Sequence, residues 1–257
     1  MLFNSYEFIF VFLPIVLGLY VTLMRFNKRT HALGLLFTSS IFFYAWWNVS
    51  FTSLLLLSIG VNFGVDWILR QLPEGREAKR ILILSVCFNL FLIGWYKYAN
   101  FFIGEVQTLA GIPVSTFDII LPLGISFFTF QQIGYVVDCY RNRVQNHSFL
   151  EFACFIAFFP QLIAGPIVQH YELIPQLGRV FRQRLVRNIG TGTMFFAIGL
   201  FKKVCIADSL AALPNSVFAL VEQGEVIGVM DAWAAALAYS LQLYFDFSGY
   251  SDMAIGL

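Results

Sequence analysis

The chain has 257 residues, of which 59% are hydrophobic and only 12% charged, and its formal net charge is +1. Because soluble domains carry roughly 25% charged residues, this composition excludes a water-soluble fold and predicts a polytopic membrane protein. The near-zero charge and the lack of a basic stripe interleaved with aromatic residues argue against a nucleic-acid partner. We expect an all-α transmembrane bundle, forming a single domain over residues 1–257, with the lipid bilayer as its surroundings.

Apolar segments recur along the chain at the length of membrane spans, since about 20 helical residues cross the hydrocarbon core. No Lys or Arg precedes Arg25, which predicts an uncleaved first span with its N-terminus outside. The predicted spans lie near residues 6–24, 32–49, 51–69, 81–101 and 119–139, followed by a broken stretch at 150–168, an ambiguous one at 191–221 and a last span from 233.

The stretch at 150–168 is apolar but interrupted by proline and glycine, so it cannot form one straight helix. If it crossed the membrane, the four arginines between residues 179 and 187 would lie outside, against the positive-inside rule. We therefore predict a re-entrant hairpin, whose broken backbone must be covered by protein or line a wet cavity. Its candidate cavity residues are Pro160, Gln161, Gly165 and Pro166.

Polar side chains form a stripe along one face of the predicted span 119–139, at about 100° per helical residue. A pair of glutamines with a tyrosine and an aspartate cannot face lipid. Two interpretations stay open: the stripe is one wall of a polar cavity, or it supplies hydrogen bonds that hold the bundle together. The candidate residues are Gln131, Gln132, Tyr135 and Asp138.

The last span carries polar groups on both sides, so protein or water must surround it, and we expect it at the centre of the bundle. At membrane depth, Asp246 has to be paired, hydrated or protonated. The candidate residues here are Gln242, Tyr244, Asp246, Ser248, Tyr250, Ser251 and Asp252.

The pair Lys202-Lys203 falls inside the ambiguous stretch and admits two placements. In one long helix the lysines lie deep and need a carboxylate such as Asp246 or Asp138. If the first part of the stretch only dips into the inner leaflet, the lysines reach back to the membrane surface. Helical spacing places Asp208 on a different face from both lysines, so it is expected to be a poor partner. This favours the surface placement and a merely structural role.

No catalytic motif is visible from chemistry alone. His31, His147 and His170 lie in polar linkers and are expected to be loop residues. The sequence contains no G-x-S-x-G elbow, Walker loop or H-E-x-x-H motif, and its four cysteines form no C-x-x-C pair. We therefore expect no metal site and no bound cofactor.

Several stretches, taken together and in this order, resemble the membrane-bound O-acyltransferase (MBOAT) family, and within it the bacterial alginate O-acetyltransferase branch. The opening residues 2–5 (LFNS) and residues 42–46 (FFYAW) are similar to the same branch, so the resemblance covers nearly the whole chain. The main stretches are residues 121–132 (LPLGISFFTFQQ), 159–167 (FPQLIAGPI), 201–208 (FKKVCIAD) and 244–255 (YFDFSGYSDMAI).

The resemblance implies an enzyme of the bacterial cytoplasmic (inner) membrane that moves an acetyl group from a cytoplasmic donor, acetyl-CoA or an acyl carrier. The implied acceptor is a hydroxyl of an extracytoplasmic, alginate-like polysaccharide, and periplasmic or extracellular partner proteins for acetylation are implied too. The catalytic residue of the family is a histidine a few tens of residues beyond the stretch that matches 244–255. We therefore expect an N-terminal fragment that is inactive alone, and we assign that role to none of the three histidines.

Two alternatives remain open. Within the same family, the chain could serve transfer of D-alanine to teichoic acids. From a different class, it could be a membrane transporter or lipid-handling protein with a polar path through the bilayer. A transporter often shows two internally related halves, and the sequence shows no such repeat.

Overall fold

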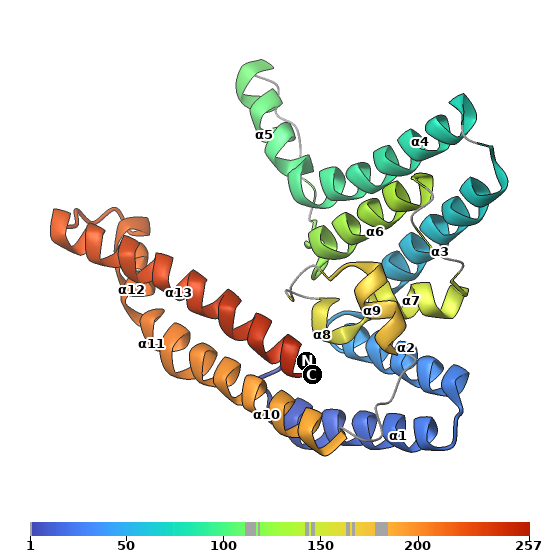
Figure 1. Cartoon of the computed structure of the whole chain (residues 1–257). Coiled ribbons are helices and arrows are strands. Elements are labelled where there is room, and N and C mark those ends of the chain that lie inside the picture. The colour runs from blue at the N-terminus through green and yellow to red at the C-terminus, as the bar shows by residue number, and fades with distance from the viewer. Residues whose placement is uncertain are drawn as a thin grey trace. The chain divides into compact units, whose positions relative to one another are not determined.

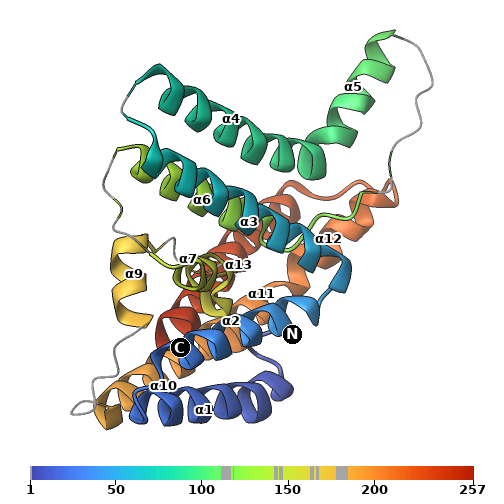
Figure 2. The same cartoon turned by 90° about the vertical axis from the view of Figure 1, so that its right-hand side faces the viewer.

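The computed structural model describes residues 2–73, 75–110, 117, 119–141, 144, 147–162, 165, 168–177 and 185–257. Within these ranges the chain is helical and contains no strand (Figures 1 and 2). Its contacts define two compact units. The smaller unit consists of Met1–Leu17, Ala164–Pro166 and Val180–Leu257, and the larger one of Gly18–Ile163 and Ile167–Arg179. The expectation of a single domain therefore stays a prediction.

The all-helical, multi-pass architecture expected from the sequence is confirmed. In the described ranges, four helices are long and apolar enough to cross a membrane. They match the spans predicted near residues 6–24, 51–69, 81–101 and 191–221. Their bounds are Phe8–Arg25, Val49–Gln71, Arg76–Val106 and Arg187–Glu222.

The larger unit is built around α3, α4 and α6, which lie side by side in both views (Figures 1 and 2). Asn48 caps α3, its side chain accepting a hydrogen bond from the Ser50 amide at 2.9 Å. The elements are α1 (Leu13–Arg25), α2 (Arg29–Ala45), α3 (Val49–Gln71), α4 (Arg76–Ile93), η2 (Gly94–Tyr98), α5 (Ala99–Ala110), α6 (Ile125–Tyr140), α7 (Phe149–Ala157), α8 (Phe159–Leu162) and α9 (His170–Leu177), with α1 shared between the units.

Helix α6 begins six residues later than the predicted span 119–139. Gly124 precedes it with φ 69°, a left-handed conformation that favours glycine, and Pro122 lies just before. These two residues delay the start of the helix, so α6 has only 16 residues. The face that carries Phe128, Gln132 and Tyr135 is buried in the larger unit.

The broken stretch at 150–168 has the interruption that the sequence predicts. A capping box between Ser148 and Glu151 starts α7, which ends at Ala157 before the short α8. The nine residues of α7 make a helix of roughly 14 Å, less than half of the hydrocarbon core of about 30 Å. Residues 163–164 and 166–167, including Pro166, lie outside the described residues.

Protein covers the backbone at this break. Residues 152–157 are all buried, and the amide of Phe159 donates to the Ser40 hydroxyl of α2 at 3.2 Å. The side-chain amide of Gln161 donates to the Phe155 carbonyl at 2.8 Å. These bonds replace helical ones that the break removes, as an irregular segment at membrane depth requires.

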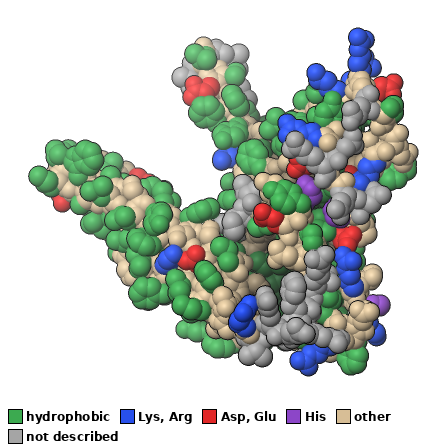
Figure 3. Space-filling model, viewed as in Figure 1, with side chains coloured by type: hydrophobic (Ala, Val, Ile, Leu, Met, Phe, Trp, Pro, Cys, Tyr) green, Lys and Arg blue, Asp and Glu red, His purple; other side chains and the backbone are tan. Residues whose placement is uncertain are grey.

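The smaller unit is a pair of long antiparallel helices, α10 and α13, with short helices at one end (Figures 1 and 2). The pair is held in very close contact by glycines: a Cβ added to Gly199 would overlap the Gly249 carbonyl oxygen and lie 2.7 Å from the Met253 amide nitrogen. Hydrophobic side chains cover most of the visible surface of α12 and α13 (Figure 3). The elements are η1 (Phe8–Phe12), α10 (Leu185–Phe201), η4 (Lys202–Ala207), α11 (Asp208–Leu210), α12 (Ala212–Glu222) and α13 (Val229–Gly256).

Candidate functional site

The polar stripe of α6 takes part in a buried network of amides and hydroxyls. Gln132 is fully buried, and its Oε1 accepts hydrogen bonds from Ser58 Oγ at 2.7 Å and from Asn62 Nδ2 at 2.5 Å. Asn62 and Asn89 exchange further hydrogen bonds across α3 and α4. Of the two interpretations of this stripe, the geometry at Gln132 favours the one in which it joins helices.

Further along the same stripe, Tyr135 and Asp138 meet a histidine that the sequence placed in a loop. His170 begins α9, is only 4% exposed, and its Nδ1 lies 3.8 Å from Asp138 Oδ2. Its ring packs edge-on against Tyr135, with centroids 5.3 Å apart. The expectation of a loop histidine is therefore wrong for His170, because three elements distant in sequence enclose it.

Burial sets the protonation of the two neighbouring histidines. Burial lowers the pKa of His170 below its usual value, although the Asp138 carboxylate opposes this shift. Burial also lowers the pKa of His147, opposed by Glu151 and reinforced by His170. The two rings lie 6.5 Å apart, so both imidazoles favour the neutral form.

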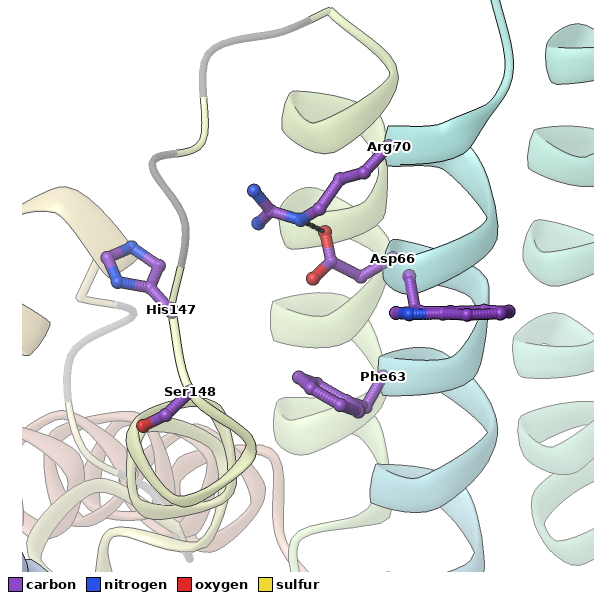
Figure 4. Close-up of a pocket in the computed structure, with 6 residues that line it drawn as sticks. Phe63, Asp66, Arg70, His147 and Ser148 are labelled. Atoms are coloured by element: carbon purple, nitrogen blue, oxygen red, sulfur yellow. Dashed lines mark hydrogen bonds and ion pairs between the residues drawn. The ribbon is translucent and has the colours of Figure 1, made fainter.

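A cavity of about 300 Å³ opens beside His147, and we call it the arginine pocket. Asp66 Oδ1 lies at its base, accepting from Arg70 Nε at 2.8 Å and from Cys139 Sγ at 2.9 Å. Figure 4 shows the Arg70 guanidinium pointing from α3 toward the segment that carries His147. The lining residues are Phe63, Asp66, Trp67, Arg70, His147 and Ser148.

Sequence reasoning missed the arginine pocket, although a signal was present. Asp66 lies within the predicted span 51–69, and an ionisable residue in a span is a functional candidate by default. Its partner Arg70 follows four residues later on the same helical face. His147 approaches only through the fold, so the spacing of residues gave no hint of it.

The smaller unit holds a second polar site, the charge cluster, defined by Lys202, Lys203, Asp208, Asp246, Ser248 and Asp252. Lys202 Nζ donates to Asp252 Oδ2 at 2.6 Å and to Ser248 Oγ at 3.1 Å. Lys203 Nζ lies 2.7 Å from Asp246 Oδ1. Both lysines thus have partners on α13, as the deep placement requires, and the expected surface placement stays a prediction.

The expectation that Asp208 is a poor partner is wrong. Lys203 Nζ donates to Asp208 Oδ1 at 2.8 Å. The reason is that residues 202–207 form a π-helix, whose wider turn places residues five apart next to each other. In an α-helix, by contrast, residues five apart lie on different faces. Single-turn π segments often occur at functional sites.

The charges of this cluster are only partly shielded. The side chains of Asp246 and Asp208 are 49% and 47% exposed, whereas that of Asp252 is 21% exposed. Two lysines and three aspartates leave an excess of one negative charge. The lysines are the sixteenth and seventeenth of the 36 residues in Arg187–Glu222, close to the middle of a candidate span. In a helix that crosses the bilayer, half-exposed carboxylates at this position require water or a polar partner.

The remaining predicted site residues have mixed surroundings. Tyr250 stacks on Phe3 with centroids 4.5 Å apart, while Tyr244 is 64% exposed. Buried oxygens of Gln242, Tyr250 and Ser251 find no hydrogen-bond partner among the described residues. In the described part of the chain, no group of three or more His, Cys, Asp or Glu side chains is placed to hold a metal ion. Pro160 is buried, Gln131 is half-buried, Gly165 is described outside any helix, and Pro166 lies outside the described residues.

Comparison with known proteins gives consistent matches. Residues 139–257 match the model of MBOAT, the membrane-bound O-acyltransferase family. The whole chain is 46% identical to 49% of the probable alginate O-acetylase AlgI of Pseudomonas aeruginosa. It is 40% identical to 53% of the peptidoglycan O-acetyltransferase of Helicobacter pylori. Over 72% of its length it is 26% identical to 51% of the teichoic acid D-alanyltransferase of Lacticaseibacillus rhamnosus. The chain spans about half the length of the curated relatives it matches.

Proposed function

Because the chain belongs to the membrane-bound O-acyltransferase family, we propose that it serves the transfer of acetyl groups to hydroxyls of an extracytoplasmic polysaccharide. The donor is acetyl-CoA or an acyl carrier on the cytoplasmic side, and the membrane is the bacterial inner membrane. The acceptor is an alginate-like polymer, with periplasmic or extracellular proteins assisting its acetylation. Membership of the family implies an acyl donor.

The observation that carries this proposal is the identity of 46% and 40% to two proteins named for O-acetyl transfer. The acceptors in their names differ, alginate in one and peptidoglycan in the other, but both polymers offer sugar hydroxyls. The relative named for D-alanyl transfer is more distant, at 26% identity over part of the chain. Acetyl is therefore favoured as the group transferred.

The charge cluster supports a polar path for this chemistry. Ionisable residues in membrane spans usually mark substrate or proton pathways, and Asp246 leaves half of its side chain accessible. A sugar hydroxyl must be desolvated and oriented before it attacks an acyl group. An aspartate held by Lys203 is a suitable hydrogen-bond acceptor for such a hydroxyl. We assign the orientation of the acceptor to Asp246.

We also propose a topology with the N-terminus outside and Arg29, Arg70 and Arg141 in the cytoplasm. Contacts in the larger unit support it, because Arg29 at the start of α2 pairs with Glu151 at the start of α7. The rings of His147 and His170, which flank the broken stretch, lie 6.5 Å apart. The stretch therefore ends beside its own beginning, as a re-entrant hairpin requires.

Cysteine accessibility in intact cells tests this topology. In a variant lacking the exposed Cys87 and Cys205, a cysteine in place of Val226, which is 98% exposed, should react with an impermeant thiol reagent from outside. A cysteine in place of Glu172 or Arg76 should react only after the membrane is permeabilised. Labelling of E172C from outside would refute the re-entrant hairpin.

The acetylation assay uses the protein expressed from its own gene in a bacterial strain lacking its O-acetylase. Ester-linked acetyl released from the polymer should appear with the protein. It should fall several-fold for Asp246→Asn but not for Asp231→Asn, a matched change on the exposed start of α13. Equal membrane levels of both variants, measured by immunoblot, exclude an effect of folding. Unchanged acetylation in D246N would contradict the role of Asp246, and release of D-alanine instead of acetyl would contradict the proposed donor.

A further inference from the structure

The arginine pocket has the layout of a binding site for a phospholipid. Phe63, Asp66, Trp67 and Arg70 follow one another at helical positions i, i+3, i+4 and i+7, and so lie on one face of α3. Along this face, the ring of Phe63 comes first, and the guanidinium of Arg70 lies in the last turn of the helix. An amphipathic ligand meets the same order of groups along a membrane normal, with its acyl chain deeper and its headgroup at the surface.

The hydrogen-bond donors at the mouth of this pocket suit an anion. Asp66 is buried, and its carboxylate is bonded to Arg70 and Cys139, so it is held in the wall and its pair with Arg70 carries no net charge. The Ser148 amide and hydroxyl both contact Glu151, which in turn pairs with Arg29. The donors that line the mouth are the Arg70 guanidinium, a planar fork of N–H groups, and the imidazole of His147. Figure 4 shows both on the same side of α3.

The apolar walls favour a lipid over a small soluble anion. Trp67 is 59% exposed, and tryptophan is enriched at the level of lipid headgroups. Phe63 packs against Phe149 and Phe152 of α7, which fixes the apolar wall opposite the mouth. The cavity of about 300 Å³ is at the lower end of the range for ligand sites, enough for a headgroup and the start of a chain.

We propose that the arginine pocket binds the phosphate of an anionic phospholipid, with Arg70 and His147 on the phosphate and Trp67 and Phe63 along the glycerol and upper acyl chain. This role is independent of acyl transfer, since it uses residues of the larger unit outside the charge cluster. The ligand is a resident lipid of the inner leaflet on the proposed topology. It joins α3 to the segment before α7 and so holds the start of the re-entrant hairpin.

Binding of an anion here couples to protonation. The charged and titratable groups that face His147 are Glu151 on α7, His170 on α9, and Arg70 and Asp66 on α3. Burial keeps the pKa of His147 low in the free protein, and a phosphate beside it favours the imidazolium. The site should therefore hold an anionic lipid more tightly as the pH falls.

Native mass spectrometry of protein extracted from vesicles with equal phosphatidylglycerol and phosphatidylcholine tests the proposal. The protein should retain phosphatidylglycerol about tenfold over phosphatidylcholine, the gain from one charge-assisted hydrogen bond. His147→Gln and Arg70→Lys should bring this ratio close to one. The matched control Arg76→Gln should keep it. The preference should also grow between about pH 7.5 and about pH 5.5 in the unaltered protein and not in H147Q.

Two variants at Arg70 avoid leaving the buried Asp66 carboxylate without a cation. Arg70→Lys keeps a positive charge beside it, and the double change Asp66→Asn with Arg70→Gln removes both charges together. At least one of these two variants should therefore fold into a monodisperse protein. A preference that persists in H147Q and in the folded Arg70 variant would overturn the proposal. Displacement of the bound lipid by millimolar inorganic phosphate would show that the site takes soluble phosphate, and would overturn the assignment to a lipid.

Discussion

Because α10 and α13 lie so close together, we predict that replacing glycine by alanine changes stability in opposite directions at two positions of α10. A Cβ at Gly199 would overlap the Gly249 carbonyl oxygen and lie 2.7 Å from the Met253 amide nitrogen. A Cβ at Gly190 would have no atom within 4 Å. Gly199→Ala should therefore destabilise the protein, and Gly190→Ala should leave it unchanged or stabilise it.

The magnitude follows from these distances. Ordinary contacts of a Cβ begin near 3.4 Å, so G199A has to move the backbones of α10 and α13 apart by about 1 Å. Backbone cannot move aside as a flexible side chain can, and overpacking of this kind costs about 1–3 kcal/mol. Replacing glycine by alanine in a helix also gains about 0.8–1 kcal/mol, but this gain is common to both variants. The difference between the two variants thus isolates the packing cost.

The measurement is the thermal midpoint of purified protein in detergent, followed by size-exclusion fluorescence. For a chain of this size, 1 kcal/mol shifts Tm by roughly 2–4 °C, so the two variants should differ by a few to about ten degrees. Because Lys202 and Lys203 lie three and four residues after Gly199, about one helical turn away, G199A should also weaken their ion pairs with α13. Equal midpoints for G199A and G190A would refute the close contact of the two helices.

Three further outcomes are expected. Gln132→Leu removes the acceptor of two buried hydrogen bonds and should cost about 1–2 kcal/mol of stability, at 0.6 to 1.7 kcal/mol per membrane hydrogen bond, whereas the neighbouring Gln131→Leu should cost less in the same thermal assay. The folded protein holds the pKa of His170 below that of the unfolded chain, so stability is complete above about pH 6.5 and falls as the pH drops; His170→Gln should flatten this slope in a pH series of Tm. The double variant with Lys203→Met and Asp246→Asn should lose less stability than the sum of the losses in the two single variants. The difference, measured in a double-mutant cycle, should be about 1 kcal/mol, and additive losses would speak against the ion pair.

Hydropathy and proline were sufficient to predict the spans near 51–69 and 81–101 and the break after Ala157 in the larger unit. Span-length apolar runs have one stable solution in lipid, a helix, and Pro160 cannot lie in the middle of a straight one. The start of α6 at Ile125 was also within reach, since Pro122 and Gly124 precede it. These features depend on residues that are close in the sequence.

Features that depend on distant elements were not predictable in the same way. Lys203 and Asp208 pair through a π-helical turn, which no periodicity of side chains announces. His170 lies in a polar linker by composition, yet it is buried because α6 and α7 close over it. The glycines of α10 and α13 share a spacing of seven residues, but only the fold shows which of them face each other.

Polar side chains differ between the two units in how far they are buried and paired, and this difference indicates which of them are available to a substrate. In the larger unit, the carbonyl oxygen of Gln132 and the carboxylate of Asp66 are buried and bonded, so they stabilise helix contacts and leave little to offer a substrate. In the smaller unit, Asp246 and Asp208 share one lysine and remain half exposed near the middle of a candidate span. Leaving a carboxylate partly uncompensated at that depth costs free energy, and such a cost is tolerated where the group serves a function. Under the proposed function, we therefore expect the acceptor of the acyl group beside Asp246.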